Sequence, residues 1–288
     1  RGLRPLRHLF IASKGKLILG CDGAGLELRM LAHFMNDLEY TAVVLDGDIH
    51  TYNQTLAGLP IRDMAKTFIY AFLYGSGIKN LAKVCGMTDS EMADKIARFK
   101  RELPALAALI IACGKSAEKY GYLQAIDGRW GRIRKSGGKV LIHTVLNVLL
   151  QMTGSLSMKY GKCFAENQLI KEGVALDVNG YPSWLADVHD EWQMEVDEGE
   201  VELMLYKVEG KAGWKADEKL QHIDSEGRIW SAPDIKEKTS DTEWLIERKF
   251  HRAGHILADN MRLAGEFLRM RIPLAGEYKI GSSWASTH

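Results

Sequence analysis

Residues 17–29 read LILGCDGAGLELR, an apolar run that ends at an acidic residue and leads into a helical pattern. The run at 17–21 has the short, apolar character of a buried strand, and Asp22 follows it directly. From residue 25 to 38 the apolar residues recur at helical spacing. We therefore predict a strand that ends at a carboxylate and is followed by a helix. An aspartate in this position is as often a helix cap as a metal ligand.

Helical periodicity continues along the chain and predicts further helices over residues 60–74, 78–85, 88–112, 142–172 and 243–268. Thr88 and Glu91 form a capping box at the start of the third of these helices. Pro104 is expected to kink or divide the same helix. Gly154 and Gly161 are expected to be weak points in the long helix that contains them.

The composition of the 288-residue chain is that of a globular protein, with 46% hydrophobic and 26% charged residues, and this excludes a disordered or fibrous chain. Lys and Arg number 38 against 37 Asp and Glu, so the net charge of +1 neither favours nor excludes nucleic acid. The apolar run at 103–113 is too short to cross a bilayer, which takes about 20 residues. The four cysteines contain no CxxC pair, which indicates free thiols in a reducing compartment.

The segment RDMAKTFIYAFLYG at 62–75 combines charged and aromatic residues on one helix face. Arg62, Lys66, Tyr70 and Tyr74 recur every four residues. Two cations followed by two aromatic rings suit a triphosphate followed by a sugar and a base. An amphipathic helix with a solvated basic end gives the same pattern at least as often.

The segment VHDEWQMEV at 188–196 carries two adjacent acids, Asp190 and Glu191. Residues 184–197 alternate in polarity and predict two short strands around a tight turn, which would hold both carboxylates at a fixed point. Hard divalent cations bind such oxygen ligands. A solvent-facing acidic turn is the common alternative.

Amide and basic residues mark two further segments. His143, Asn147 and Gln151 share one face of the helix predicted over 142–172, where amides can contact base edges in a minor groove or make only surface hydrogen bonds. The Gly and basic residues at 128–139 predict a hairpin or loop.

In this order along the chain, the segments resemble the motifs of the family A DNA polymerases, in particular the phage-type replicative branch. DGAGLELR at 22–29 resembles the first motif, RDMAKTFIYAFLYG the fingers-helix motif, and VHDE at 188–191 the third motif. The other matching segments are GDIHT at 47–51, LNVLLQ at 146–151 and the terminal WASTH at 284–288. The resemblance covers about residues 1–207 and 250–288. It implies an α+β fold, with an antiparallel palm sheet and helical fingers.

The resemblance implies template-directed DNA synthesis on a primer 3′-hydroxyl by two-metal nucleotidyl transfer, in phage replication. Asp22 and Asp190 would bridge two Mg²⁺ ions, with the Gly23 carbonyl as a further ligand and Glu191 in support. Lys66 would donate a proton to the pyrophosphate leaving group.

The resemblance also implies binding roles for other side chains. His50, Arg62 and Lys66 would contact the phosphates of the incoming dNTP. Tyr70 would pack on its sugar and base, and Glu27 would sterically exclude a 2′-hydroxyl. The residues expected to contact DNA are Arg29, Tyr74, Arg129, His143, Asn147, Gln151 and His189. A basic stretch, in which a phosphate track and a solvated hairpin are equally plausible readings, consists of Arg129, Arg132, Arg134, Lys135 and Lys139.

The implied domains are a palm at 1–47 and 128–288 and fingers at 48–127, with an insertion at about 208–245. The thumb and exonuclease of the family would precede Arg1, so an upstream polymerase segment is expected as a partner, together with primer–template DNA and dNTP. No membrane partner is expected. The expected location is the cytoplasm, that of the host cell if the protein is phage-encoded.

Two rival functions stay open. A single-subunit RNA polymerase shares the palm, but a carboxylate at Glu27 that excludes the 2′-hydroxyl does not suit ribonucleotides. A fragment that binds DNA without synthesis is favoured by the missing thumb and disfavoured by the presence of every expected catalytic side chain.

Overall fold

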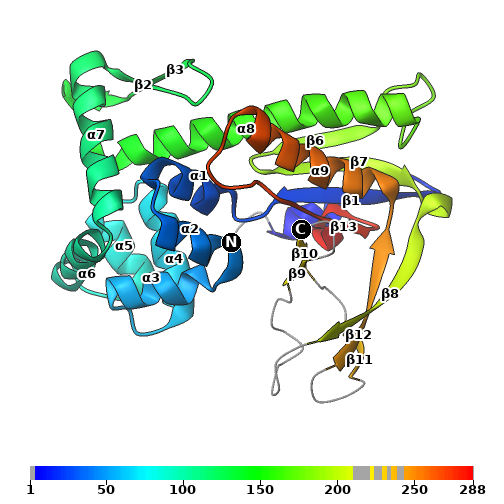
Figure 1. The fold of residues 1–288 in the computed structure, drawn as a ribbon, viewed down its shortest axis with the longest axis horizontal. Helices are drawn as coiled ribbons and strands as arrows, with labels where there is room; N and C mark the ends of the chain where they lie inside the picture. The colour runs from blue at the N-terminus through cyan, green and yellow to red at the C-terminus, as the bar shows by residue number, and fades with distance from the viewer. Residues whose placement is uncertain (1–3, 210–220, 224–228, 232–234, 239–242, 288) are drawn as a thin grey trace. The chain divides into compact units, whose positions relative to one another are not determined.

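The computed structural model describes the chain except residues 1–3, 210–220, 224–228, 232–234, 239–242 and 288. The backbone forms two compact units. The first, here the sheet unit, comprises residues 1–24, 157–267 and 274–288, and the second, the helical unit, comprises residues 25–156 and 268–273. Figure 1 shows their elements, coloured along the chain.

The sheet unit is built on an antiparallel sheet of strand order β13-β1-β7-β6. Its strands are β1 (Lys16–Gly23), β6 (Trp184–Val188), β7 (Glu191–Asp197) and β13 (Gly276–Gly281). They confirm the strands that the sequence predicts at 17–21 and within 184–197.

One face of this sheet is buried under two helices. Cys21 of β1 pairs with Trp192 and Tyr278 on the neighbouring strands, and all three are buried. Helix α9 (Arg252–Phe267) and the C-terminal half of α8 (Ile142–Glu172) cover this face. At Gly161 of α8 a methyl group would lie 2.9 Å from the Trp192 ring. The other face carries Asp22 and the short helix α10 (Trp284–Thr287).

Further strands of this unit are β8 (Glu202–Glu209), β9 (Gln221–Ile223), β10 (Ile229–Ser231), β11 (Ile235–Lys238) and β12 (Glu243–Phe250). They form the sheets β11-β12-β8 and β10-β9. The expected insertion at about 208–245 therefore contains strands, and the rest of it lies outside the described residues.

The prediction of a helix over 243–268 is wrong for the first third of that range. Residues 243–250 form β12, which pairs with β8 along its whole length. The helix starts at Arg252, and the His251 ring caps it by accepting a 3.1 Å hydrogen bond from the Ala253 N–H. A partner strand distant in sequence thus outweighs the local helical spacing.

The helical unit contains α1 (Leu26–Met35), α2 (Leu38–Asp46), α3 (Ile49–Ala57), α4 (Arg62–Leu73), α5 (Ile78–Cys85), α6 (Asp89–Glu102), α7 (Pro104–Tyr120) and the first half of α8. The short strands β2 (Tyr122–Gln124), β3 (Trp130–Arg132), β4 (Lys135–Ser136) and β5 (Lys139–Val140) form two hairpins, as expected at 128–139. The capping box of α6 is confirmed. Pro104 divides the predicted 88–112 helix and opens α7.

The architecture is mixed, with helices and an antiparallel sheet, as the sequence predicts. The compact units break at residues 24/25 and 156/157, whereas the palm and fingers were expected to break at 47/48 and 127/128. The palm and fingers are defined by function, and compact units do not test such a division. The assignment of residues to palm and fingers therefore stays a prediction. Within the described residues, no helix has the length and apolarity that crossing a membrane requires.

Candidate active site

The acids that the sequence singles out lie at one end of the sheet unit's central sheet. Asp22 pairs with Glu191 on β7 and with Glu277 on β13. The Gly23 N–H donates a 2.8 Å hydrogen bond to the Asp190 carbonyl oxygen. Segments far apart in the sequence therefore meet at this end of β1, and they carry Asp22, Gly23, Asp190 and Glu191.

Asp190 is held at the tip of a tight hairpin. Val188 pairs with Glu191, so only His189 and Asp190 connect β6 to β7. His189 has a φ of 52°, a left-handed conformation that costs energy for a residue with a Cβ. The turn that presents Asp190 therefore stores backbone strain.

Glu191 is buried and oriented by hydrogen bonds. Its Oε1 accepts a 2.8 Å bond from the indole N–H of Trp284, in α10, and another bond from the amide of Gln193. The Thr287 hydroxyl in turn donates to Gln193 Oε1 over 2.9 Å. The C-terminal helix thus positions the carboxylate next to Asp190.

This donor set fits Mg²⁺. The ion binds hard oxygen ligands and commonly takes one or two carboxylates, with waters and substrate phosphates completing its shell. Asp22, Asp190 and the Gly23 carbonyl supply such oxygens. Among the residues that the structure describes, no group of three or more His, Cys, Asp or Glu side chains is arranged to hold a metal. Further ligands would have to come from backbone, water or substrate.

Helix α4 of the helical unit presents three of the expected nucleotide-binding residues, Arg62, Lys66 and Tyr70, on its outer face. Ala65, Phe68, Ile69 and Leu73 are buried along the inner face. Arg62 and Lys66 are exposed and Tyr70 is half-buried. The inner face packs on α6, where the ring of Phe99 lies 5.5 Å from that of Phe68.

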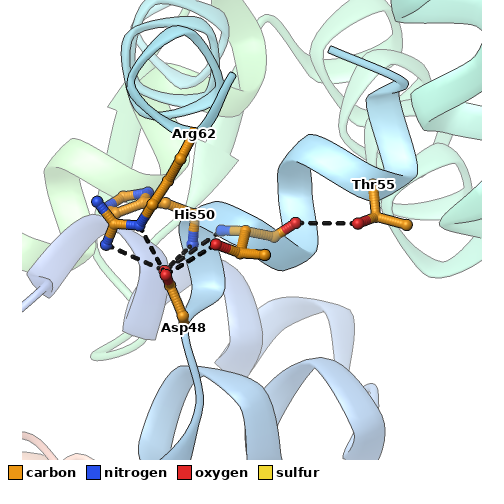
Figure 2. Close-up of polar contacts among 5 residues, drawn as sticks. Asp48, His50, Thr55 and Arg62 are labelled. Carbon is orange, nitrogen blue, oxygen red and sulfur yellow. Dashed lines mark hydrogen bonds and ion pairs between the residues drawn. The ribbon is translucent and has the colours of Figure 1, made fainter. Parts of the chain in front are cut away.

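Asp48 contacts two of the expected nucleotide-binding residues, His50 and Arg62, as Figure 2 shows. Its carboxylate caps α3 by accepting from the His50 and Thr51 N–H groups. The guanidinium of Arg62 donates to the same carboxylate, with distances of 2.6 Å from Nε and 3.1 Å from Nη2. Burial opposes ionisation of Asp48, but the hydrogen bonds from Arg62 and Thr51 outweigh it and lower its pKa to about 2. The His50 ring lies 5.9 Å from that of Tyr70, so α3 and α4 bring His50, Arg62 and Tyr70 together.

Glu27 of α1 is bonded to Tyr74, the residue that caps α4, and the end of α4 lies against the start of α8. The Tyr74 hydroxyl donates a 2.5 Å hydrogen bond to Glu27 Oε1. The next residue, Gly75, has a φ of 74°, and a Cβ there would lie 2.8 Å from the His143 carbonyl oxygen. Glycine is therefore needed where α4 ends against the start of α8.

The remaining expected residues differ in exposure. On α8, His143 is exposed and Asn147 and Gln151 are half-buried, which confirms that they follow one accessible helix face. Arg29 is 4% exposed and donates to the Pro273 carbonyl oxygen over 2.5 Å. Arg129 is exposed, and its Nε lies 2.7 Å from Asp127 Oδ2.

A family model described as DNA polymerase family A matches residues 2–221. The chain belongs to this family. It is 32% identical, over 97% of its length, to the DNA-directed DNA polymerase of Escherichia phage Phieco32, and 36% identical, over 64%, to that of Escherichia phage T7. DNA polymerase I of Rhizobium leguminosarum is 27% identical over 69% of the chain. These similarities confirm the phage-type resemblance.

The chain spans 41% of the length of the Phieco32 polymerase and 28% of the length of the T7 polymerase. Among solved structures it resembles the "POL domain of Pol1 from M. smegmatis complex with DNA primer-template and dNTP", with a TM-score of 0.69 over 98% of this chain and 42% of that one. At 18% identity this match supports the fold alone. Since 97% of the chain aligns with the Phieco32 polymerase, the segment at about 208–245 falls largely within that alignment.

Sequence reasoning on this family A chain missed Asp48, Gln193 and Glu277. Asp48 carried a usable signal, because an aspartate directly before a helix is a favoured cap. The positions of Gln193 and Glu277 depend on strand register, which no local pattern in the sequence sets.

Proposed function

We propose that this chain carries the catalytic part of a template-directed DNA polymerase, which adds deoxyribonucleotides to a primer 3′-hydroxyl. The observation that supports this function most directly is the junction of β1 and the β6–β7 turn. There the Gly23 N–H bonds to the Asp190 carbonyl, beside Asp22, in a family A chain. Phage replication is the process proposed for it, since its relatives include phage polymerases.

Asp22, Asp190 and the Gly23 carbonyl would hold two Mg²⁺ ions. When bound, these ions would supply charge neutralisation on the phosphates and a lower pKa of the primer hydroxyl. Glu191, held by Trp284 and Gln193, would keep its carboxylate in a fixed direction beside these ligands.

The outer face of α4 would bind the triphosphate. Arg62 and Lys66 are exposed cations one helical turn apart, and His50 on α3 lies beside Tyr70. Lys66 would donate the proton that the pyrophosphate leaving group needs. Asp48 keeps the guanidinium of Arg62 in place before the anion arrives, which lowers the entropy lost on binding.

The other residues would select the sugar and contact the DNA. Tyr70 would pack on the sugar and base. Glu27, oriented by the Tyr74 hydroxyl, would exclude a 2′-hydroxyl. The side chains proposed to contact DNA are Arg29, Tyr74, Arg129, His143, Asn147, Gln151 and His189. Arg29 is largely buried, and its hydrogen bond to the Pro273 carbonyl oxygen holds its side chain on α1.

The proposed partners are primer–template DNA, dNTP and a further polymerase segment carrying a thumb and possibly an exonuclease. The third partner is proposed because the chain spans less than half of its phage relatives. A thumb grips duplex, so adding such a segment should raise primer affinity more than the rate of the chemical step.

Primer extension with Mg²⁺ and dNTPs tests the function. We expect Asp22→Asn and Asp190→Asn to lower extension on the order of 100-fold or more while primer–template binding is kept, because only the metal ligands are removed. Asp197→Asn is the matched control, since Asp197 ends β7 and pairs with Lys16 over 2.7 Å. It should extend primers as the wild type does.

Three outcomes would contradict the proposal. Equal extension by the Asp22 variant would remove the metal assignment. Equal use of ribonucleotides would favour an RNA polymerase. Binding without extension, even with the unmatched part of a phage relative added, would indicate a non-catalytic DNA-binding protein.

A further inference from the structure

The last residue of α7 and the hairpin formed by β2 and β3 together carry a row of three aromatic rings outside the hydrophobic core. The rings of Tyr122 and Trp130 stack at 4.6 Å, with 12° between their planes. The ring of Tyr120 lies 5.8 Å from that of Tyr122. Trp130 is 69% exposed and Tyr120 is 54% exposed. We call Tyr120, Tyr122 and Trp130 the aromatic ladder.

The hairpin is anchored by its opposite face, which keeps the ladder turned outward. Leu123 pairs with Gly131 between the outward-facing residues. Leu123 is buried in a cluster with Val145 and Leu149 of α8. A Cβ at Gly131 would lie 2.6 Å from the sulfur of Met152, so β3 lies directly against that helix. Figure 1 shows the hairpin at the end of α7.

Between residues 118 and 140, the stretch that contains the ladder, basic residues outnumber the two acids, Glu118 and Asp127. The Lys119 ammonium lies over the Tyr120 ring, 4.8 Å from its centroid. Arg132 is exposed opposite Tyr122. The only acid in the β2–β3 loop, Asp127, is occupied by Arg129 at 2.7 Å. No acid follows between 128 and 140, where the exposed cations continue with Arg134, Lys135 and Lys139.

We propose that the aromatic ladder is a binding site for single-stranded DNA. Unpaired bases would stack on Trp130 and Tyr120, and the surrounding cations would contact the phosphates. Exposed rings beside cations are the features that such sites share, because every base has a π-face and every nucleotide a negative charge. This proposal depends on the proposed function only in the choice of DNA over RNA as the ligand. In a DNA polymerase the single strand would be the unpaired part of the template.

The cross-strand pair also stabilises the hairpin, so the test must separate binding from folding. The probe is a fluorescein-labelled oligo(dT) of twenty nucleotides, titrated with the full chain and followed by anisotropy. Trp130→Leu removes the ring and keeps an apolar side chain, whereas Trp130→Phe keeps a ring. Tyr181→Leu is the matched control, because Tyr181 is also an exposed aromatic residue (63%) and lies outside the ladder. Circular dichroism and the thermal midpoint establish that each variant is folded.

We expect Trp130→Leu to weaken oligo(dT) binding by about fivefold or more, with Trp130→Phe closer to wild type and Tyr181→Leu unchanged. Arg132→Gln should lower the slope of log affinity against log salt by about 0.7, the value for one phosphate contact on a single strand.

Unchanged oligo(dT) binding by a folded Trp130→Leu variant would overturn the proposal. So would an equal loss of binding to blunt duplex DNA, since duplex offers no unpaired bases. A wild-type chain that binds oligo(dT) through Trp130 but extends no primer would fail only the polymerase function. A chain that extends primers without needing Trp130 for oligo(dT) would fail only this inference.

Discussion

His33 on α1 illustrates how one buried side chain couples the helical unit to pH. Its Nδ1 accepts a 3.1 Å hydrogen bond from the Arg271 N–H, and the Arg271 guanidinium donates to the His33 carbonyl over 3.0 Å. Burial, followed by the positive charge of Arg271, lowers the pKa of His33 from 6.5 to about 4. The folded state therefore keeps this ring neutral where an unfolded histidine would already be protonated.

This coupling predicts a loss of stability in acid. The contribution of His33 is complete above the unfolded pKa of 6.5, and it is lost as the pH falls toward about 4. It amounts to about 3 kcal/mol at most. In His33→Asn the side-chain oxygen replaces the Nδ1 acceptor but does not titrate. Urea unfolding between pH 7 and pH 4 should show the free energy of unfolding falling less in the variant than in the wild type. Parallel curves for the two proteins would contradict this prediction.

At the scale of elements, the two glycines that looked like weak points in α8 are contact points. A Cβ at Gly154 would lie 3.3 Å from Leu26 of α1. A Cβ at Gly161 would lie 2.9 Å from the Trp192 ring and 3.2 Å from the Asn260 carbonyl oxygen. The sequence predicted the bounds of α8 correctly because they follow local periodicity. It could not show that α8 packs against Leu26 of α1 at one glycine and against Trp192 of β7 at the other.

Gly161→Ala tests this packing. Alanine gains about 1 kcal/mol in helix propensity, whereas overpacking against the buried Trp192 costs about 1–3 kcal/mol. We expect the packing cost to dominate and the thermal midpoint to fall. Gly114→Ala in α7 is the control, because the nearest atom there, 3.3 Å away, is a terminal methyl of Ile142, which can move. That variant should be as stable as the wild type or more so, and a Gly161→Ala variant of equal stability would contradict the packing.

At the scale of the whole molecule, the four thiols report on both compact units. Cys21 belongs to the sheet unit, and Cys85 and Cys113 to the helical unit; all three are buried, and only Cys163 is exposed. Burial raises the pKa of Cys21 well above its usual value and that of Cys113 to about 11. Because the thiolate is the reactive form, the buried cysteines should be inert in the folded chain.

We therefore predict that a thiol reagent titrates one cysteine rapidly in the folded protein and all four after denaturation. The Cys163→Ser variant should lack the rapid phase. A second rapid thiol would show that one of the two units is not packed as described, and mass spectrometry of the labelled peptide would identify which.

The sequence by itself determined several elements and the family: the strand that leads to Asp22, the bounds of α8, the outer face of α4 and the family to which the motifs belong. Periodicity and motif order are local properties, so they can be read without a partner segment. Only the tertiary structure decided that 243–250 is a strand, that Glu277 lies opposite Asp22 and that Asp48 holds Arg62. Register and cross-element hydrogen bonds depend on which distant segments pair, and a local pattern carries no record of that choice.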